Sequence, residues 1–304
     1  MEATPYRVAI VGLDLTKMDD AIVKYLPHLL KAFPLERVIF VHVAKELELP
    51  EELSKTYPDL IAPIDEGIAA DIQKKVDPVF KDGEVEYDVV IQEGPPLDTF
   101  LRVAKIKNAD LIVMGRKKII EGSGLLAGHI VRKSPASMLF ITEDSPQQLK
   151  NILLPIDFSR HSALTVKIAQ VLKERTGAQL HFSHIYKIPA GFYKTGKSRE
   201  QFSDIMKSHA EKDFLRFCKQ NQLGDEYTCR FIESEDAIPK LIYQHAEEVK
   251  ADLILIGSRG RTKSSALLIG SVVEKLMFED ADIPVFIAKN KGESMSFFEA
   301  LMKI

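Results

Sequence analysis

The residues with the clearest chemical use in this sequence are four small residues that follow an apolar run. The run covers residues 253–256, Gly257 and Gly260 come directly after it, and nine residues separate Gly260 from Gly270 and Ser271. Glycine lacks a Cβ, so the backbone there turns tightly and comes close to an anion. The amides that open the next helical segment at Gly270 lack helical partners, and they suit phosphate oxygens together with the serine hydroxyl. The pattern therefore predicts a phosphate-binding loop at the end of a strand.

The same frame recurs in altered form in the first half of the chain. Gly115 follows the apolar run 111–114, but Lys118 stands where the second glycine is expected, and His129 follows Gly128 in place of a serine. A lysine at this point either fills the space in which amides would meet phosphate or binds a smaller anion as a point charge. We therefore expect a tandem repeat whose first site is degenerate.

Alternating short and long segments predict the elements that position these loops. Short apolar runs alternate in both halves with longer segments of helical spacing, which is typical of βαβ units around a parallel sheet. We expect an α/β protein with two doubly wound, Rossmann-like sheets of five parallel strands each, and ligands at the carboxyl ends of the strands. The expected strands are 8–13, 38–43, 86–92, 111–114 and 138–142, then 151–156, 179–185, 227–232, 253–256 and 284–288.

Turn-forming and helix-breaking residues mark the limits of several segments. Pro27 lies within the apolar spacing of the first helix and predicts a kink or a late start, and Gly177 should end the first helix of the second half. A short polar linker at residues 143–148 separates the halves and is too short for independent tumbling. We therefore expect domains at 1–146 and 147–304, with a final helix over 294–304 that docks on one of them.

Composition and charge exclude several classes of protein. A net charge of −3 and a pI near 6.3 leave no basic excess, which argues against a nucleic-acid-coating role. Cys218 and Cys229 form no CxxC or metal-binding spacing and favour a reducing compartment. The chain starts without a basic-then-apolar leader, and no apolar stretch approaches the ~18 residues that span a bilayer. We expect a cytoplasmic protein without a membrane partner.

Other catalytic interpretations fail on placement. His181 and His184 lie three residues apart in an expected strand, so their side chains point to opposite faces and cannot bind one metal. We expect His161, two residues after Ser159, to be a surface helix residue, and the acidic run 233–236 to favour the start of the following helix. Neither half has the GxxxxGK[ST] motif of Walker-type nucleotidases, and no GxGxxG follows the first strand. A dinucleotide oxidoreductase is therefore not expected.

Taken together, the motifs of the second half resemble the universal stress protein family. Residues 153–159, 251–257, the two glycine pairs and residues 283–285 stand in the order and spacing of that family. The whole chain looks like two copies of that fold in one polypeptide. The first half keeps Asp14, with His42 and Val43 at the positions of His184 and Ile185, but lacks the proline before the aspartate.

In the ATP-binding branch of that family, the resemblance implies a role for each part of the second half. Asp157 would bond ribose or adenine, the backbone of Ile185 would meet adenine, and the glycine loop would hold the phosphates. The candidate ligand-binding residues are Pro155, Ile156, Asp157, Ser159, Ile185, Gly257, Arg259, Gly260, Gly270, Ser271 and Val272. The expected ligand is ATP, with or without Mg²⁺, and no protein metal site is expected.

Simpler structural roles remain open for the same residues. Gly257 and Gly260 could serve only a turn and close helix packing, and either Asp157 or Ser159 could cap the following helix. Arg259 adds positive charge beside the loop, but on a loop such charge is often solvated surface.

Binding is the expected output, because the site contains no obvious general base. Two alternatives remain: a slow ATPase or phosphotransfer enzyme, suggested by the cationic and hydroxyl groups of Arg259, Thr262, Ser264, Ser265 and Ser271, and a ligand-free interaction scaffold. The resemblance further implies that the halves pair through residues 138–141 and 285–288 as an internal pseudo-dimer. Two such chains could then form a homodimer, and any protein partner is unknown.

Overall fold

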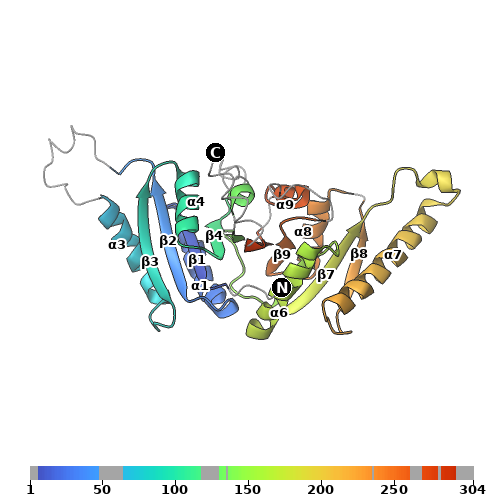
Figure 1. Cartoon of the computed structure of the whole chain (residues 1–304), viewed down its shortest axis with the longest axis horizontal. Coiled ribbons are helices and arrows are strands. Elements are labelled where there is room, and N and C mark those ends of the chain that lie inside the picture. The colour runs from blue at the N-terminus through green and yellow to red at the C-terminus, as the bar shows by residue number, and fades with distance from the viewer. Residues whose placement is uncertain are drawn as a thin grey trace.

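The computed structural model describes residues 6–47, 64–117, 130–134, 136–234, 236–260, 269–279 and 282–291, and these form one ten-stranded sheet with helices on both faces (Figure 1). The strand order is β3-β2-β1-β4-β5-β10-β9-β6-β7-β8. The strands are β1 (Val8–Leu13), β2 (Arg37–Ala44), β3 (Glu86–Glu93), β4 (Leu111–Gly115), β5 (Ser137–Ile141), β6 (Asn151–Pro155), β7 (Gln179–Tyr186), β8 (Cys229–Glu233), β9 (Leu253–Gly257) and β10 (Val285–Ala288).

The two halves carry the same sheet in mirrored order and meet at their last strands. Within each half the pairs are parallel, whereas β5 and β10 pair antiparallel, with Leu139 opposite Phe286. The predicted α/β class, the two five-stranded parallel sheets and the pairing through the last strands are therefore confirmed. The predicted strand over 227–232 begins later, at Cys229.

Helices cover both faces of this sheet, as a doubly wound fold requires. They are α1 (Met18–Ala32), α3 (Ile64–Val76), α4 (Pro96–Ile106), α6 (Arg160–Thr176), α7 (Arg199–Gln220), α8 (Ile238–Glu248) and α9 (Ser271–Leu276), with 3₁₀ turns η2 (Asp77–Val79) and η4 (Phe192–Thr195). Pro27 lies inside α1, which nevertheless starts at Met18, so the expected late start is wrong. Gly177 ends α6 as predicted, with a left-handed φ of 77°.

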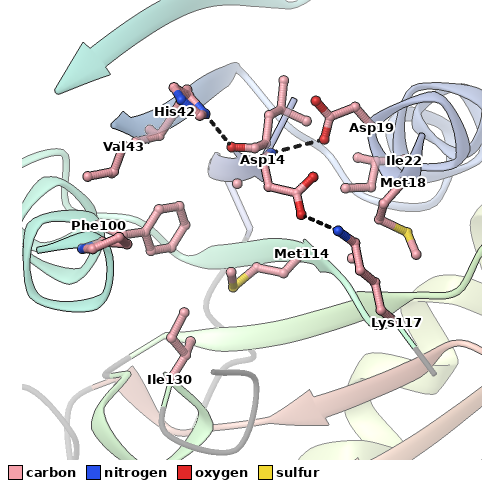
Figure 2. Close-up of a pocket in the computed structure, with 15 residues that line it drawn as sticks. Asp14, Met18, Asp19, Ile22, His42, Val43, Phe100, Met114, Lys117 and Ile130 are labelled. Carbon is pink, nitrogen blue, oxygen red and sulfur yellow. Dashed lines mark hydrogen bonds and ion pairs between the residues drawn. The ribbon is translucent and has the colours of Figure 1, made fainter. Parts of the chain in front are cut away.

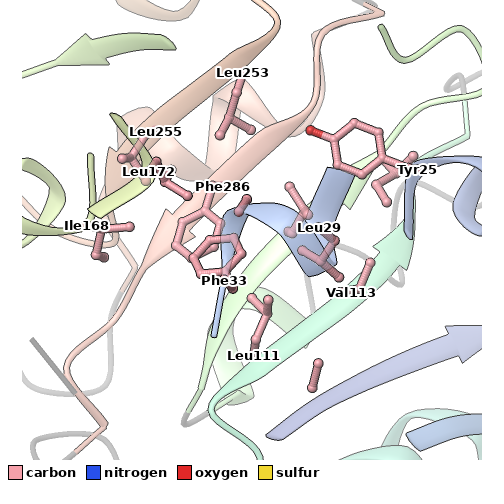
Figure 3. Packing of buried hydrophobic residues seen from close by; sticks show 14 of the residues in the cluster. Tyr25, Leu29, Phe33, Leu111, Val113, Ile168, Leu172, Leu253, Leu255 and Phe286 are labelled. Atoms are coloured by element: carbon pink, nitrogen blue, oxygen red, sulfur yellow. The ribbon is translucent and has the colours of Figure 1, made fainter. Parts of the chain in front are cut away.

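The halves share their hydrophobic core across the central strand pair. One cluster packs α1, α3, α6 and α7 on one face, and a second packs α4, α8 and α9 on the other. In Figure 3, Phe33 of α1's end stacks on Phe286 of β10 at 5.5 Å between ring centroids, with Ile168 and Leu172 of α6 nearby. Burial of this kind is the main favourable term in folding. The two halves are therefore joined by a continuous core.

The repeat extends to single backbone angles and hydrogen bonds. Leu15 and Phe158, each one residue after the aspartate of its half, have φ values of 61° and 62°. Asp110 accepts two backbone N–H groups at the start of β1, both at 3.0 Å. Asp252 accepts two at the start of β6, at 2.7 and 2.9 Å. The two halves therefore share the same local backbone structure at these positions.

A buried arginine fastens one half to the other. Arg116, directly after β4, is only 5% exposed. Its guanidinium donates to the hydroxyl of Tyr243 at 2.8 Å, to the carbonyl of Leu276 at 3.3 Å and to that of Ile283 at 3.4 Å. The contacts with Leu276 and Ile283 satisfy backbone oxygens near the end of α9 and before β10, so an arginine of the first half supplies hydrogen bonds to the second.

No described helix is both long and apolar enough to cross a membrane. The helix expected over 294–304 lies outside the described residues, and the domain boundary at 146/147 stays a prediction.

Candidate functional site

The loop after β9 brings the predicted glycines of the second half together. The amide of Gly270 donates to the carbonyl of Ser258 at 2.9 Å. A Cβ added to Gly270 would lie 3.5 Å from Cα of Arg259. Gly257, Gly260 and Gly270 all lack a positive φ. Backbone conformation therefore does not require glycine at these three positions, and a Cβ at Gly270 would make only an ordinary van der Waals contact.

Asp157 reaches the same loop from the end of the neighbouring strand β6. A Cβ added to Gly260 would lie 2.7 Å from Oδ2 of Asp157, closer than real Cβ contacts allow. The carboxylate and the second glycine of the loop are thus adjacent, because β6 and β9 are parallel neighbours. Arg259, between the glycines, is partly buried.

The other carboxylate oxygen of Asp157 belongs to the turn that opens α6. Oδ1 accepts the Ser159 amide at 3.1 Å and the Ser162 hydroxyl at 2.8 Å. The hydroxyl of Ser159 accepts the Ser162 amide at 3.3 Å and caps the helix. The capping role considered for Ser159 is confirmed, and Asp157 both orders this turn and lies against Gly260.

Gly257 serves close packing of a helix against β9. A Cβ added there would lie 3.0 Å from Cβ of His161 and 3.2 Å from its backbone. His161 is 7% exposed, so its expected position on the surface is wrong. The error has a physical reason: the first turn of α6 approaches β9 because Gly257 leaves it room.

An aromatic stack holds the ends of β6 and β7 together. The Nδ1 atom of His184 bonds the carbonyl of Ile156 at 2.8 Å, and the Phe158 ring stacks on the imidazole at 4.3 Å. Ile185, the next residue of β7, is partly buried beside this contact. The imidazole of His181 instead meets Asn151 Oδ1 at 3.1 Å, so the two histidines have separate partners.

The remaining predicted residues flank the loop from two sides. Pro155 ends β6, and Ile156 follows it and is 4% exposed. Ser271 and Val272 begin α9, whose N-cap is Gly270. Thus the predicted set comes from the ends of β6, β7 and β9 and the start of α9. The described residues include no cluster of three metal-ligating His, Cys, Asp or Glu side chains.

The loop also adjoins the contact between the halves through Lys289. The amide of Ser258 bonds the carbonyl of Ala288, the last residue of β10. The next residue, Lys289, places its ammonium against the backbone carbonyls of Val131 and Ser134 in the first half. Burial and then the charge of Arg259 lower the pKa of Lys289 to about 7.

In the first half, Asp14, the counterpart of Asp157, takes part in an ion pair. Lys117 Nζ lies 2.7 Å from Asp14 Oδ2 (Figure 2). Burial alone would raise the pKa of Asp14, but hydrogen bonds from Lys117 and Thr16 outweigh it and lower the pKa. His42 Nδ1 bonds the Leu13 carbonyl at 2.9 Å, and His184 makes the equivalent bond to Ile156 in the second half. Lys118, Gly128 and His129, on which the degenerate site was predicted, lie outside the described residues.

Comparison with known proteins identifies the family. A model of the universal stress protein family matches residues 5–141 and again residues 148–289. The chain belongs to the universal stress protein family. The predicted tandem arrangement is confirmed, since each half matches the family by itself.

Relatives of this universal stress protein include two from Methanocaldococcus jannaschii. Universal stress protein MJ0531 is 27% identical over 144 residues, covering 46% of this chain and 82% of the relative. Universal stress protein MJ0577 is 25% identical over 159 residues, covering 47% and 96%. A solved structure of a functionally unknown protein from Pseudomonas aeruginosa covers 98% of both chains with a TM-score of 0.67 and 15% identity. At that identity, the likeness shows the fold alone.

Sequence reasoning missed three residues of these two sites in this universal stress protein. Ser162 joins the Asp157 turn, Phe158 stacks on His184, and Lys117 pairs with Asp14. The sequence did offer a signal for the His184 contact, because His42 stands at the equivalent position of the first half. Each imidazole bonds a backbone carbonyl at the end of the neighbouring strand. No spacing rule separated Lys117 from Lys118.

Proposed function

We propose that this universal stress protein binds an adenine nucleotide, ATP, in its second half and acts in the stress response by binding more than by turnover. The observation that carries the proposal is the contact of the Asp157 carboxylate with Gly260 at the carboxyl end of β9. A carboxylate, which can accept hydrogen bonds from sugar hydroxyls, thus lies beside the glycine loop at the edge where parallel sheets bind ligands. The family's ATP-binding branch, which the motifs resemble, uses residues at these positions.

Each part of the proposed site has a chemical task. Asp157 accepts hydrogen bonds from ribose hydroxyls, while the backbone near Ile185 meets the adenine. The Ser271 hydroxyl, Arg259 and loop amides other than that of Gly270, which donates to Ser258, would bind the phosphates. Mg²⁺ would arrive with the triphosphate as its counter-ion.

Thermal unfolding of the full chain tests this proposal. Millimolar Mg-ATP should raise the melting temperature, since a ligand at 100 times its Kd stabilises the native state by about 2.7 kcal/mol. Gly260→Lys should abolish the increase, because its side chain enters the space beside Asp157. Gly191→Lys is the matched control, since Gly191 has open space around its Cα. A native protein that shows no increase in melting temperature at millimolar Mg-ATP would refute the proposal.

Turnover remains the alternative activity of the same site. Of the hydroxyl groups that suggested it, Thr262, Ser264 and Ser265 lie outside the described residues. A phosphate-release assay separates the two functions: the binding proposal expects release indistinguishable from the Asp157→Ala variant. Release that falls in this variant would favour a slow ATPase.

A cytoplasmic location and association of two chains complete the proposal. Size-exclusion chromatography with light scattering measures the second point directly, and a mass of one chain at micromolar concentration would contradict it.

A further inference from the structure

The first half contains a cavity of about 300 Å³ that the proposed function does not use. It lies at the carboxyl ends of β1, β2 and β4, beside the start of α1 and of α4 (Figure 2). This volume is at the lower end of the range for small-molecule sites. The cavity therefore accommodates a small ligand.

Hydrocarbon and sulfur form most of the cavity wall. Phe100 of α4, Met114 of β4 and Ile130 face the same space, which Met18 and Ile22 of α1 close on the other side (Figure 2). Gly12 permits this arrangement, since a Cβ there would lie 3.0 Å from the Phe100 ring. Methionine side chains adapt their shape and make favourable contacts with aromatic rings. Such a wall suits a flat apolar molecule.

The polar groups at the cavity already have partners within the protein. Asp19 accepts the amides of Asp14 and Leu15 at 3.1 and 2.9 Å. His42 bonds a backbone carbonyl, and Asp14 and Lys117 neutralise each other. A ligand that entered would therefore gain chiefly from burial of apolar surface.

A phosphate group does not fit this cavity. The carboxylate of Asp14, which pairs with Lys117, would lie close to a phosphate bound by this ammonium and would repel it. The first glycine of the loop is also covered, because a Cβ on Gly115 would collide with the side chain of Met18. In the second half, His161 stands at the position of Met18, and its nearest atom would lie 3.0 Å from a Cβ on Gly257, farther than the Met18 side chain would lie from a Cβ on Gly115.

We propose that the first half of this protein is a separate ligand site, which binds a small, uncharged aromatic molecule between Phe100, Met18 and Met114. The two halves then differ in ligand class: the second takes a charged nucleotide, and the first takes a neutral apolar ring. The proposal does not depend on nucleotide binding in the second half.

The probe is indole, titrated into full-length protein with ¹³C-labelled methionine methyl groups. The methyl signals of Met18 and Met114 should shift and saturate, whereas that of Met277 in the second half should not. Met18→Leu and Met114→Leu assign the signals. Val43→Phe, which fills the cavity from β2, should weaken indole binding at least tenfold. Ile185→Phe is the matched control, since Ile185 follows His184 as Val43 follows His42, and it should leave indole binding unchanged.

Circular dichroism melting verifies that each variant is folded. If Val43→Phe does not fold, Met114→Trp is a second variant that fills the cavity. Three results would overturn the proposal: Met18 and Met114 signals that do not respond to indole, indole binding that survives a folded filling variant, or equal shifts with inorganic phosphate. Loss of indole binding in Ile185→Phe would place the probe in the wrong half and would also overturn it.

Discussion

Replacement of Arg116 by methionine should lower the free energy of unfolding of the full chain by about 3 kcal/mol. The guanidinium donates three hydrogen bonds across the contact between the halves, and a hydrogen bond to a charged group contributes about 1 kcal/mol or more after the loss of water. Methionine retains most of the apolar stem of arginine, so the decrease in the free energy of unfolding reports the lost hydrogen bonds. The carbonyl of Ile283 loses this donor, whereas the carbonyl of Leu276 keeps the Tyr243 hydroxyl as a donor.

Urea unfolding followed by far-UV circular dichroism measures this change. Arg102→Met on the exposed side of α4 is the matched control and should stay within about 0.5 kcal/mol of the native value. Because Tyr243 contacts Arg116 directly, the effects of Arg116→Met and Tyr243→Phe should not add. A loss below about 1 kcal/mol for Arg116→Met, or simple additivity in the double variant, would refute the role assigned to this arginine.

Three further predictions concern single residues. The pKa of Lys289 is lowered to about 7, so between pH 7 and the ordinary lysine pKa the unfolded chain binds one proton more than the native chain. As the pH increases over this range, the free energy of unfolding should therefore rise by up to about 1.4 kcal/mol per pH unit relative to Lys289→Met. Parallel pH profiles of the two proteins would contradict this. Gly257→Ala should cost about 1–3 kcal/mol without any ligand, because its Cβ meets His161, whereas Gly191→Ala should not; equal chemical denaturation curves would disprove the close packing. Lys117→Met should raise the pKa of Asp14, measured by ¹³C NMR of the carboxyl group, because burial then acts without its main opposing contact; an unchanged titration would count against the ion pair.

The fold was predictable because its signals are local and repeated. Each strand except β8 starts within one residue of its predicted start, since short apolar runs are typical of buried parallel strands. Strand β8 begins at Cys229 because the backbone amide of Tyr227 donates to the carbonyl of Gly224 in the preceding turn. The pairing of β5 with β10 came from the family resemblance, because the sequence pattern alone does not specify which edges meet.

The details of the candidate site were less predictable because they depend on tertiary contacts. His161 has the sequence context of an exposed helix start and is buried only because Gly257 lies beneath it. Arginine side chains are mostly exposed, yet Arg116 is buried and its partners lie in the other half of the chain. Spacing alone placed Lys118 at the first-half loop, whereas the described ion pair uses its neighbour Lys117.

Isothermal titration of the full chain with Mg-ATP tests the central claim most directly. The account predicts one site per chain, since Asp157 lies against Gly260 in the second half, whereas Asp14 pairs with Lys117 in the first. That site should be lost in Gly260→Lys and kept in Val43→Phe. Binding that persists in Gly260→Lys, a stoichiometry of two, or the absence of heat at millimolar Mg-ATP would contradict it.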